Sequence, residues 1–160
     1  MFCIVYNDMV KSWEVFYHGK DEQTAAYAAA PSPQDDGHVL LTLPEETLLP
    51  AMETDNGTLY LCDGYDIAVQ TMESGNLDAT VRQICGFGSE DLTIMQTQSG
   101  EFNCYDFVWS AATDLGQQVG RAKVLDDSSY HYVLSACAPA KDAEEYYEIW
   151  NGIFESFAIA

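Results

Sequence analysis

The chain has 160 residues, of which 48% are apolar, and its 26 acidic and six basic residues give it a net charge of −20. The apolar share is too high for a disordered chain, and the length suits one ordinary domain. The negative charge repels nucleic-acid phosphates and anionic lipid surfaces, which excludes nucleic acid as an expected partner. The apolar runs are too short to span a bilayer, so we expect no direct membrane insertion.

The acidic residues are unevenly distributed along the chain. No Lys or Arg lies between Lys20 and Arg82, whereas twelve Asp and Glu lie there. Such a stretch produces a negative field that steers a basic partner, although acidity also serves solubility alone. We expect a protein partner, with a basic one favoured, and an acidic binding surface within residues 21–81.

The N-terminal part of the chain, residues 1–64, is rich in strand signals. Short β-branched and aromatic runs occupy Phe2–Tyr6, Trp13–Tyr17 and Val39–Leu43, and each predicts a strand. Pro44 to Leu49 is compatible with one helical turn, because proline fits a first helical position. The sequence Asp55-Asn56-Gly57 predicts a tight hairpin turn, because Asn-Gly tolerates positive φ angles.

The middle of the chain predicts strands followed by a helix. Leu59–Cys62 and Tyr65–Thr71 are strand candidates, and the second alternates as a sheet with one buried face does. Apolar residues at helical spacing then predict a helix from about 77 to 85. Asn76 is its expected N-cap, and Gly86 is its expected C-terminal stop.

The C-terminal half predicts a run of strands and a final helix. Short polar turns separate the expected strands Leu92–Thr97, Phe102–Ala111, Gln118–Leu125 and Tyr130–Cys137. Short turns join antiparallel neighbours, whereas parallel neighbours need long crossovers. The final helix is expected to begin at Pro139, and its wide apolar stripe must pack on the sheet. The prediction is a single α+β domain, residues 1–160, with an antiparallel β-sheet flanked by helices.

Two motifs carry a resemblance to a known family. The last strand reads Tyr130-His131-Tyr132-Val133-Leu134-Ser135, and the last helix closes on Ile153-Phe154-Glu155-Ser156-Phe157-Ala158-Ile159. In these motifs and in element order, residues 65–160 resemble the PsbP-like domains, whose fold the Ran-binding nuclear import factor shares, and particularly uncharacterised bacterial surface-protein domains. The resemblance implies an α/β/α sandwich and a non-enzymatic binding role. Residues 1–64 are expected to be the strand-rich N-terminal part of the same domain.

The cellular compartment follows from two conflicting signals. The resemblance slightly favours an extracytoplasmic or cell-surface location, whereas a native start at Met1 without a leader favours the cytoplasm. The five cysteines are odd in number and lack C-x-x-C spacing, so a disulfide framework is not indicated. Most of them lie in apolar strand-like runs, where a free thiol behaves as a small hydrophobe, and this mildly suggests a reducing compartment.

Catalytic and metal-binding patterns are weak. Cys137 lies six residues beyond His131 on the same strand, about 20 Å away at ~3.3 Å per residue, so only a cross-strand contact of His131 with Cys104 would suit nucleophilic catalysis. No pair of metal ligands has zinc spacing, and the acidic turns do not follow a calcium-loop pattern. We expect no catalytic residue, no metal and no cofactor.

The remaining signal is a set of aromatic and acidic residues suited to contact a partner. The expected partner-binding residues are Trp13, Trp109, Tyr130, His131, Asp126 and Asp127. The preferred function is a non-enzymatic protein-binding or assembly domain, with a monomer expected rather than a dimer. One alternative is an acidic secretion-type chaperone, which would be dimeric. The other is a small-ligand-binding or enzymatic domain, which requires a deep pocket with converging polar groups.

Overall fold

A computed structural model of the chain describes residues 39–44 and 50–159. The predicted strands Phe2–Tyr6 and Trp13–Tyr17, and most of the predicted helical turn from Pro44, lie outside these residues. Among the described residues, no helix is long and apolar enough to cross a membrane.

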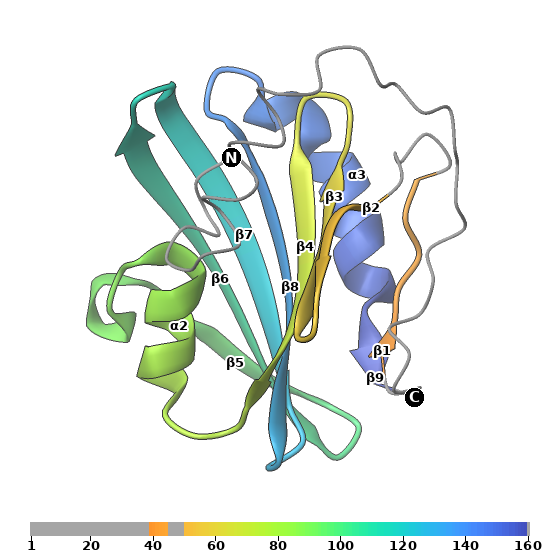
Figure 1. Cartoon of the computed structure of the whole chain (residues 1–160). Helices are drawn as coiled ribbons and strands as arrows, with labels where there is room; N and C mark the ends of the chain where they lie inside the picture. The colour runs from red at the N-terminus through yellow and green to blue at the C-terminus, as the bar shows by residue number, and fades with distance from the viewer. Residues whose placement is uncertain (1–38, 45–49, 160) are drawn as a thin grey trace.

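A seven-stranded antiparallel sheet forms the centre of the described structure (Figure 1). Its order is β2-β3-β4-β8-β7-β6-β5, so β2 and β5 are the edge strands. A separate short pair joins β1 (Val39–Leu40) to β9 (Ala158–Ile159). In spatial order, the sheet strands are β2 (Pro50–Thr54), β3 (Gly57–Leu61), β4 (Asp66–Glu73), β8 (Tyr130–Pro139), β7 (Gly116–Asp126), β6 (Phe102–Thr113) and β5 (Met95–Ser99).

The first predicted hairpin is confirmed. The turn at Asp55 and Asn56 joins β2 to β3, and Thr54 pairs with Gly57 across it. The sequence did not mark β2 as a strand, because Pro50 and Glu53 are poor strand formers. Proline is tolerated there because β2 is an edge strand, where a missing N–H breaks no inner ladder.

Helix α2 (Leu77–Cys85) confirms the predicted capping. The side chain of Asn76 accepts a hydrogen bond from the backbone N–H of Asp78 at 2.9 Å. Gly86 ends the helix with φ of 79°, in the left-handed region that favours glycine. A short 3₁₀ turn, η2 (Ser89–Asp91), follows before β5.

Two predicted boundaries are wrong. Helix α3 spans Ala143–Ser156 and does not begin at Pro139, because Pro139 still pairs with Gln118 at the end of β8. Strand β5 begins at Met95 and not at Leu92. The side chain of Leu92 packs instead against the core under α2, so this stretch is part of the connection to the helix.

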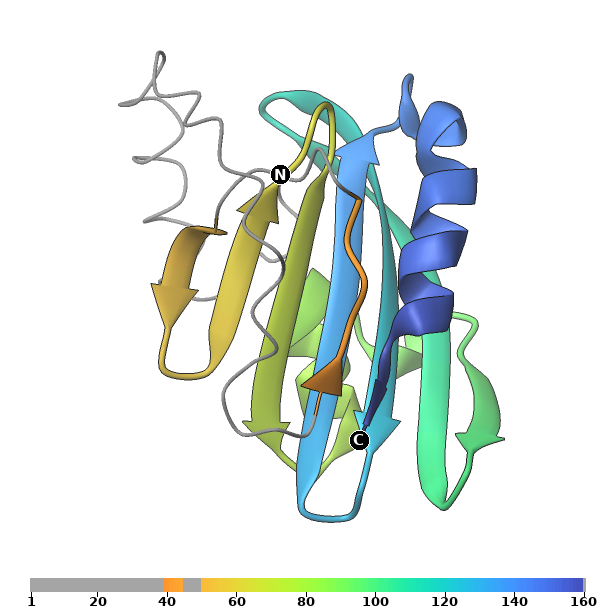
Figure 2. The same ribbon diagram turned by 90° about the vertical axis from the view of Figure 1, so that its right-hand side faces the viewer.

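The two helices pack on opposite faces of the sheet, as Figures 1 and 2 show. One core joins α3 to residues such as Leu134 and Ala136 of β8, and the other joins α2 to the alternate residues Val133 and Cys137. The single buried face predicted for β4 is wrong, because Ala68 and its neighbours on both faces are buried. Helix α3 covers the middle of its face, and this leaves the outer strands β6 and β5 exposed there.

Asp78 connects α2 to the chain that follows it. Its carboxylate accepts hydrogen bonds from the backbone N–H and the hydroxyl of Ser89, at 2.7 and 2.8 Å, and from Arg82 Nε at 2.7 Å. The backbone N–H of Ser89, followed by Arg82 and the Ser89 hydroxyl, holds the pKa of Asp78 well below its usual range. Each of these donors favours the ionised carboxylate.

The substitution Asp78→Asn is expected to destabilise the protein at neutral pH and to have little effect in acid. A lowered pKa in the folded state means that ionised Asp78 stabilises the fold above its unfolded value of about 3.9, and that this stabilisation is lost as the pH falls through the folded pKa. Urea unfolding of both proteins at pH 7 and at successively lower pH measures the difference. An equal difference at every pH, or an equal pH dependence in a Glu155→Gln control, would contradict this role.

Candidate functional site

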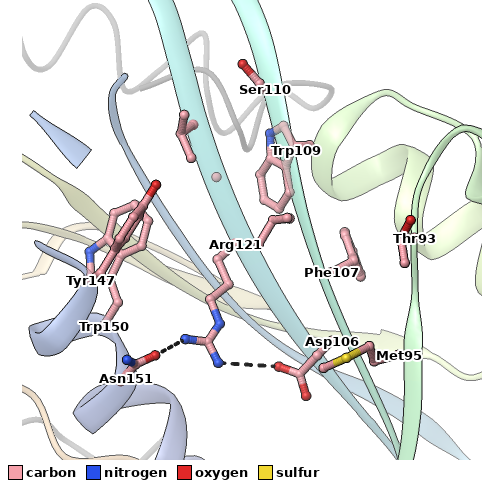
Figure 3. Close-up of a pocket in the computed structure, with 13 residues that line it drawn as sticks. Thr93, Met95, Asp106, Phe107, Trp109, Ser110, Arg121, Tyr147, Trp150 and Asn151 are labelled. Atoms are coloured by element: carbon pink, nitrogen blue, oxygen red, sulfur yellow. Dashed lines mark hydrogen bonds and ion pairs between the residues drawn. The ribbon is translucent and has the colours of Figure 1, made fainter. Parts of the chain in front are cut away.

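An open groove of ≈ 870 Å³ lies on the α3 face of the sheet. It lies between α3 and the outer strands, and Figure 3 shows its side chains. We define the groove by the residues Met95, Asp106, Val108, Arg121, Tyr147 and Asn151.

Strand alternation and the position of α3 produce the groove. Asp106 and Val108 are two residues apart on β6, so both side chains point to the α3 face. Helix α3 packs over β8 and reaches only as far as Arg121 of β7. As a result Val108 is 63% exposed and Met95 on β5 is 62% exposed, and the outer strands form an uncovered apolar floor.

Arg121 forms the polar end of the groove. Its guanidinium donates to Asn151 Oδ1 at 2.6 Å, and its other terminal nitrogen lies 3.7 Å from Asp106 Oδ1 (Figure 3). The guanidinium carbon also lies 4.4 Å from the ring centroid of Phe154. These contacts fix a partly exposed cation between helix and sheet, with N–H groups left for an acceptor from outside.

The other side of the groove is an apolar and aromatic wall on α3. The ring of Tyr147 is 47% exposed and lies 6.1 Å from that of Trp150, which is buried. The indole Nε1 of Trp150 has no hydrogen-bond partner in the structure. Exposed apolar surface grouped around an aromatic ring is typical of sites that bind other molecules.

The rim of this wall is acidic. Glu144, Glu148 and Glu155 are exposed, and each lies three, four or seven residues from Asn151, as Tyr147 does, so all five lie on one side of α3. Helix α3 contains no Lys or Arg. The exposed glutamates at this rim belong to α3, whereas the sequence placed the acidic surface within residues 21–81.

The structure disperses the residues predicted to contact a partner. Trp13 lies outside the described residues. Tyr130 is 45% exposed at the β7–β8 turn. Asp127 accepts hydrogen bonds from the backbone N–H groups of Ser129 and Tyr130 in that turn, which gives it a local structural role.

Trp109 of β6 is buried and is one of the residues that line the groove. Its ring covers Gly120 of the neighbouring strand, at a position where a Cβ atom would meet the ring. A partner cannot reach most of this side chain in the structure as it stands.

His131 is buried beneath α2. Its Nδ1 lies 2.7 Å from the hydroxyl of Thr80, and its Nε2 lies 3.6 Å from Asp126 Oδ2. The three residues have the composition of a catalytic triad, but Thr80 is 5% exposed and His131 is 1% exposed. Because neither lines the groove, the arrangement connects α2 to the β7–β8 turn and gives a substrate no access.

The cysteines do not form a catalytic or metal site among the described residues. Cys104 lies in the α3-side core, whereas His131 bonds to α2 on the other face, so the cross-strand pairing considered for catalysis does not occur. Burial raises the pKa of the thiols of Cys85 and Cys104, which keeps both protonated. The described part of the chain contains no group of three metal-ligating side chains.

Cys137 forms a disulfide, although the sequence did not indicate a disulfide framework. Cys85 and Cys104 are free thiols, whereas Cys137 is disulfide-bonded.

Two solved structures align with this fold. Cyanobacterial PsbP (CyanoP) from Synechocystis sp. PCC 6803 aligns with a TM-score of 0.59 and 9% identity, over 86% of this chain and 96% of its own. The chain has the PsbP-like fold. LpqN of Mycobacterium tuberculosis, which is described as involved in cell envelope biogenesis, aligns with a TM-score of 0.52 and 15% identity, over 76% of this chain and 83% of its own. No protein-family model and no curated protein sequence matches the chain.

These likenesses confirm the resemblance drawn from the C-terminal motifs, and at such identities they concern the fold alone. The groove residues Val108, Arg121, Tyr147 and Asn151 were not found from the sequence. The one sequence feature that could have indicated the groove is Val108, because it is an apolar residue that alternation places on the same face of β6 as the polar residues Asp106 and Ser110. An apolar residue in such a position indicates either cover by another element or an exposed binding surface.

Proposed function

We propose that this PsbP-like domain is a non-enzymatic protein-binding or assembly module, and that the groove is its binding surface. The observation that carries the proposal is the open groove itself, which combines exposed Val108 and Met95 with the exposed ring of Tyr147 and the oriented guanidinium of Arg121. Tyrosine and arginine are enriched among the residues that dominate protein interfaces.

The chemistry of the groove supports binding rather than catalysis. Its polar side chains are few, and the hydroxyl of Ser110 accepts a hydrogen bond from the amide Nε2 of Gln117 at 2.6 Å, which is a donor and cannot act as a base. The only histidine among the residues 39–44 and 50–159 is His131, which is buried on the opposite face. A nucleophile with an adjacent base, the usual minimum for covalent catalysis, is thus missing from the described groove.

We further propose an extracytoplasmic location. LpqN is described as involved in cell envelope biogenesis, which suits a domain of this fold outside the cytoplasm. The disulfide at Cys137 points the same way, because structural disulfides persist in oxidising compartments and are rare in the cytosol.

Capture experiments with variant proteins test the proposed function. The immobilised protein should retain a specific protein from an extract of the source organism, and the variants Val108→Arg and Tyr147→Ala should lose it. The matched control is Leu40→Arg, which replaces another half-exposed apolar strand residue outside the groove lining and should retain the same protein. Equal retention by all four proteins would show that the groove is not the binding surface.

A further inference from the structure

The outer edge of β6 is only half covered. Strand β5 pairs with β6 from Phe102 to Asp106, whereas β7 pairs with β6 as far as Thr113. Residues 107–113 of β6 therefore have a neighbouring strand on one side, and among the described residues they have none on the other.

This open edge presents unpaired backbone groups. In an antiparallel ladder every second residue directs its N–H and C=O away from the paired neighbour, so about three residues of this segment direct both groups outward. Exposed edges are usually protected by charged residues, proline or bulges. The segment Phe107–Thr113 contains neither charge nor proline, and its pairing with β7 is regular.

Hollows lie on both sides of this edge. The groove lies on the α3 side, and a second hollow of ≈ 300 Å³ is lined by Phe87 and Leu92 from the α2–β5 connection and by Trp109. Both hollows include Val108 and Ser110 of β6. An added strand would direct its alternate side chains to opposite faces, into one hollow and then the other.

A buried donor without a partner lies at the same place. The indole Nε1 of Trp109 has no hydrogen-bond partner, although the residue is only 5% exposed. Buried N–H groups are almost always paired in folded proteins. Trp109 lines both hollows beside the open edge, where the carbonyl groups of an added strand would supply an acceptor.

The charges around the edge select the partner. Asp91 lines the second hollow, Asp106 lines the groove, and the exposed Glu144 and Glu148 border it on α3. Among the described residues, the only cation lining either hollow is Arg121, which already contacts Asp106 and Asn151. A second copy of this chain, with net charge −20, would be repelled, whereas a segment bearing Lys or Arg would be attracted.

The geometry points to strand addition: an extended segment of a partner protein, in which basic and apolar side chains alternate, pairs with β6 along residues 107–113. This inference rests on the proposed function and specifies both how the partner binds and which kind of segment it presents.

A synthetic peptide tests the inference without the natural partner. The probe is a capped peptide of alternating Lys and Val, as long as the open edge, and its binding is followed by fluorescence anisotropy and by amide hydrogen exchange. The peptide should bind, more weakly at high salt, and should slow exchange at alternate residues within 107–113. Val108→Arg should abolish binding, whereas Leu40→Arg should leave it unchanged.

Control peptides separate strand addition from other binding. Two N-methylated peptides are compared, one methylated at the odd-numbered and one at the even-numbered residues. Only one of these sets of N–H groups faces β6, so one of the two peptides should bind at least about tenfold more weakly, because it has lost the hydrogen bonds to the edge. Exchange of Lys for Glu should abolish binding. Peptide binding without new amide protection, or unaffected by N-methylation, would overturn strand addition and leave groove binding intact.

Other outcomes would also overturn the inference. One is failure of the Lys-Val peptide to bind at millimolar concentration, and the capture experiment would then decide the proposed function separately. Another is self-association of the wild-type protein that Val108→Arg abolishes, since this would make a second copy the occupant of the edge.

Discussion

The substitution Gly120→Ala is expected to lower the free energy of unfolding by about 1–3 kcal/mol, the usual cost of overpacking a core. An ideal Cβ atom at Gly120 would overlap two ring atoms of Trp109. The ring is buried and packs against Phe107 at 5.8 Å between centroids, so it cannot rotate away freely. Urea unfolding followed by tryptophan fluorescence and circular dichroism measures the loss.

A double-mutant cycle tests the cause of that loss. Trp109→Ala alone should cost about 3–5 kcal/mol, as for other large aromatic truncations. In that background Gly120→Ala should cost much less, because the ring that it would meet is gone. Gly152→Ala on α3, where a Cβ would meet nothing within 4 Å, should instead stabilise the helix by about 0.5–1 kcal/mol. Additive losses at Gly120 and Trp109 would contradict this explanation.

The substitution Gly64→Ala is expected to be similarly harmful, for two separable reasons. Gly64 has φ of +85°, in the left-handed region, and a Cβ there would overlap the hydroxyl and ring carbon of Tyr146. The backbone conformation alone costs a non-glycine residue about 1–2 kcal/mol. Displacement of Tyr146 would also remove its packing on Tyr65, whose ring lies 4.9 Å away. The expected total loss is about 2–4 kcal/mol.

Gly100 provides the matched control for the contribution of the ring. It has φ of +66°, but a Cβ there would meet nothing within 4 Å. Gly100→Ala should therefore cost only the backbone strain, and Gly64→Ala should cost clearly more in the same unfolding experiment. Equal losses at the two glycines would show that the contact with Tyr146 does not matter.

Local sequence signals predicted the local structure well. Asn76 and Gly86 lie where their conformational preferences require, because capping geometry depends on a few neighbouring residues. The hairpin turn also forms where it was predicted, at Asp55 and Asn56, but without the positive φ angles that motivated the prediction. Boundaries that depend on distant contacts were less predictable. Pro139 was expected to begin a helix, but pairing with Gln118 keeps it in the sheet.

The candidate site was poorly predictable, because it depends on which surface α3 leaves uncovered. The alternation of apolar and polar residues shows which side chains of β6 share a face, but it does not show which strands a helix will cover. His131 shows the same difficulty from the other side. It was expected to contact a partner, yet it is buried and its ring nitrogen lies 2.7 Å from the hydroxyl of Thr80 of α2, 51 residues away in the sequence. Aromatic and acidic composition cannot distinguish such buried residues from exposed ones.

The most direct test of the account is site-specific photo-crosslinking in the source organism. A photoreactive amino acid replaces Val108 in the groove in one strain and Leu40, outside it, in another. The account predicts that irradiation crosslinks a discrete protein partner at position 108, through a segment rich in Lys or Arg, and not at position 40. The account is contradicted if no partner is crosslinked at position 108, or if the same partner is crosslinked equally at both positions.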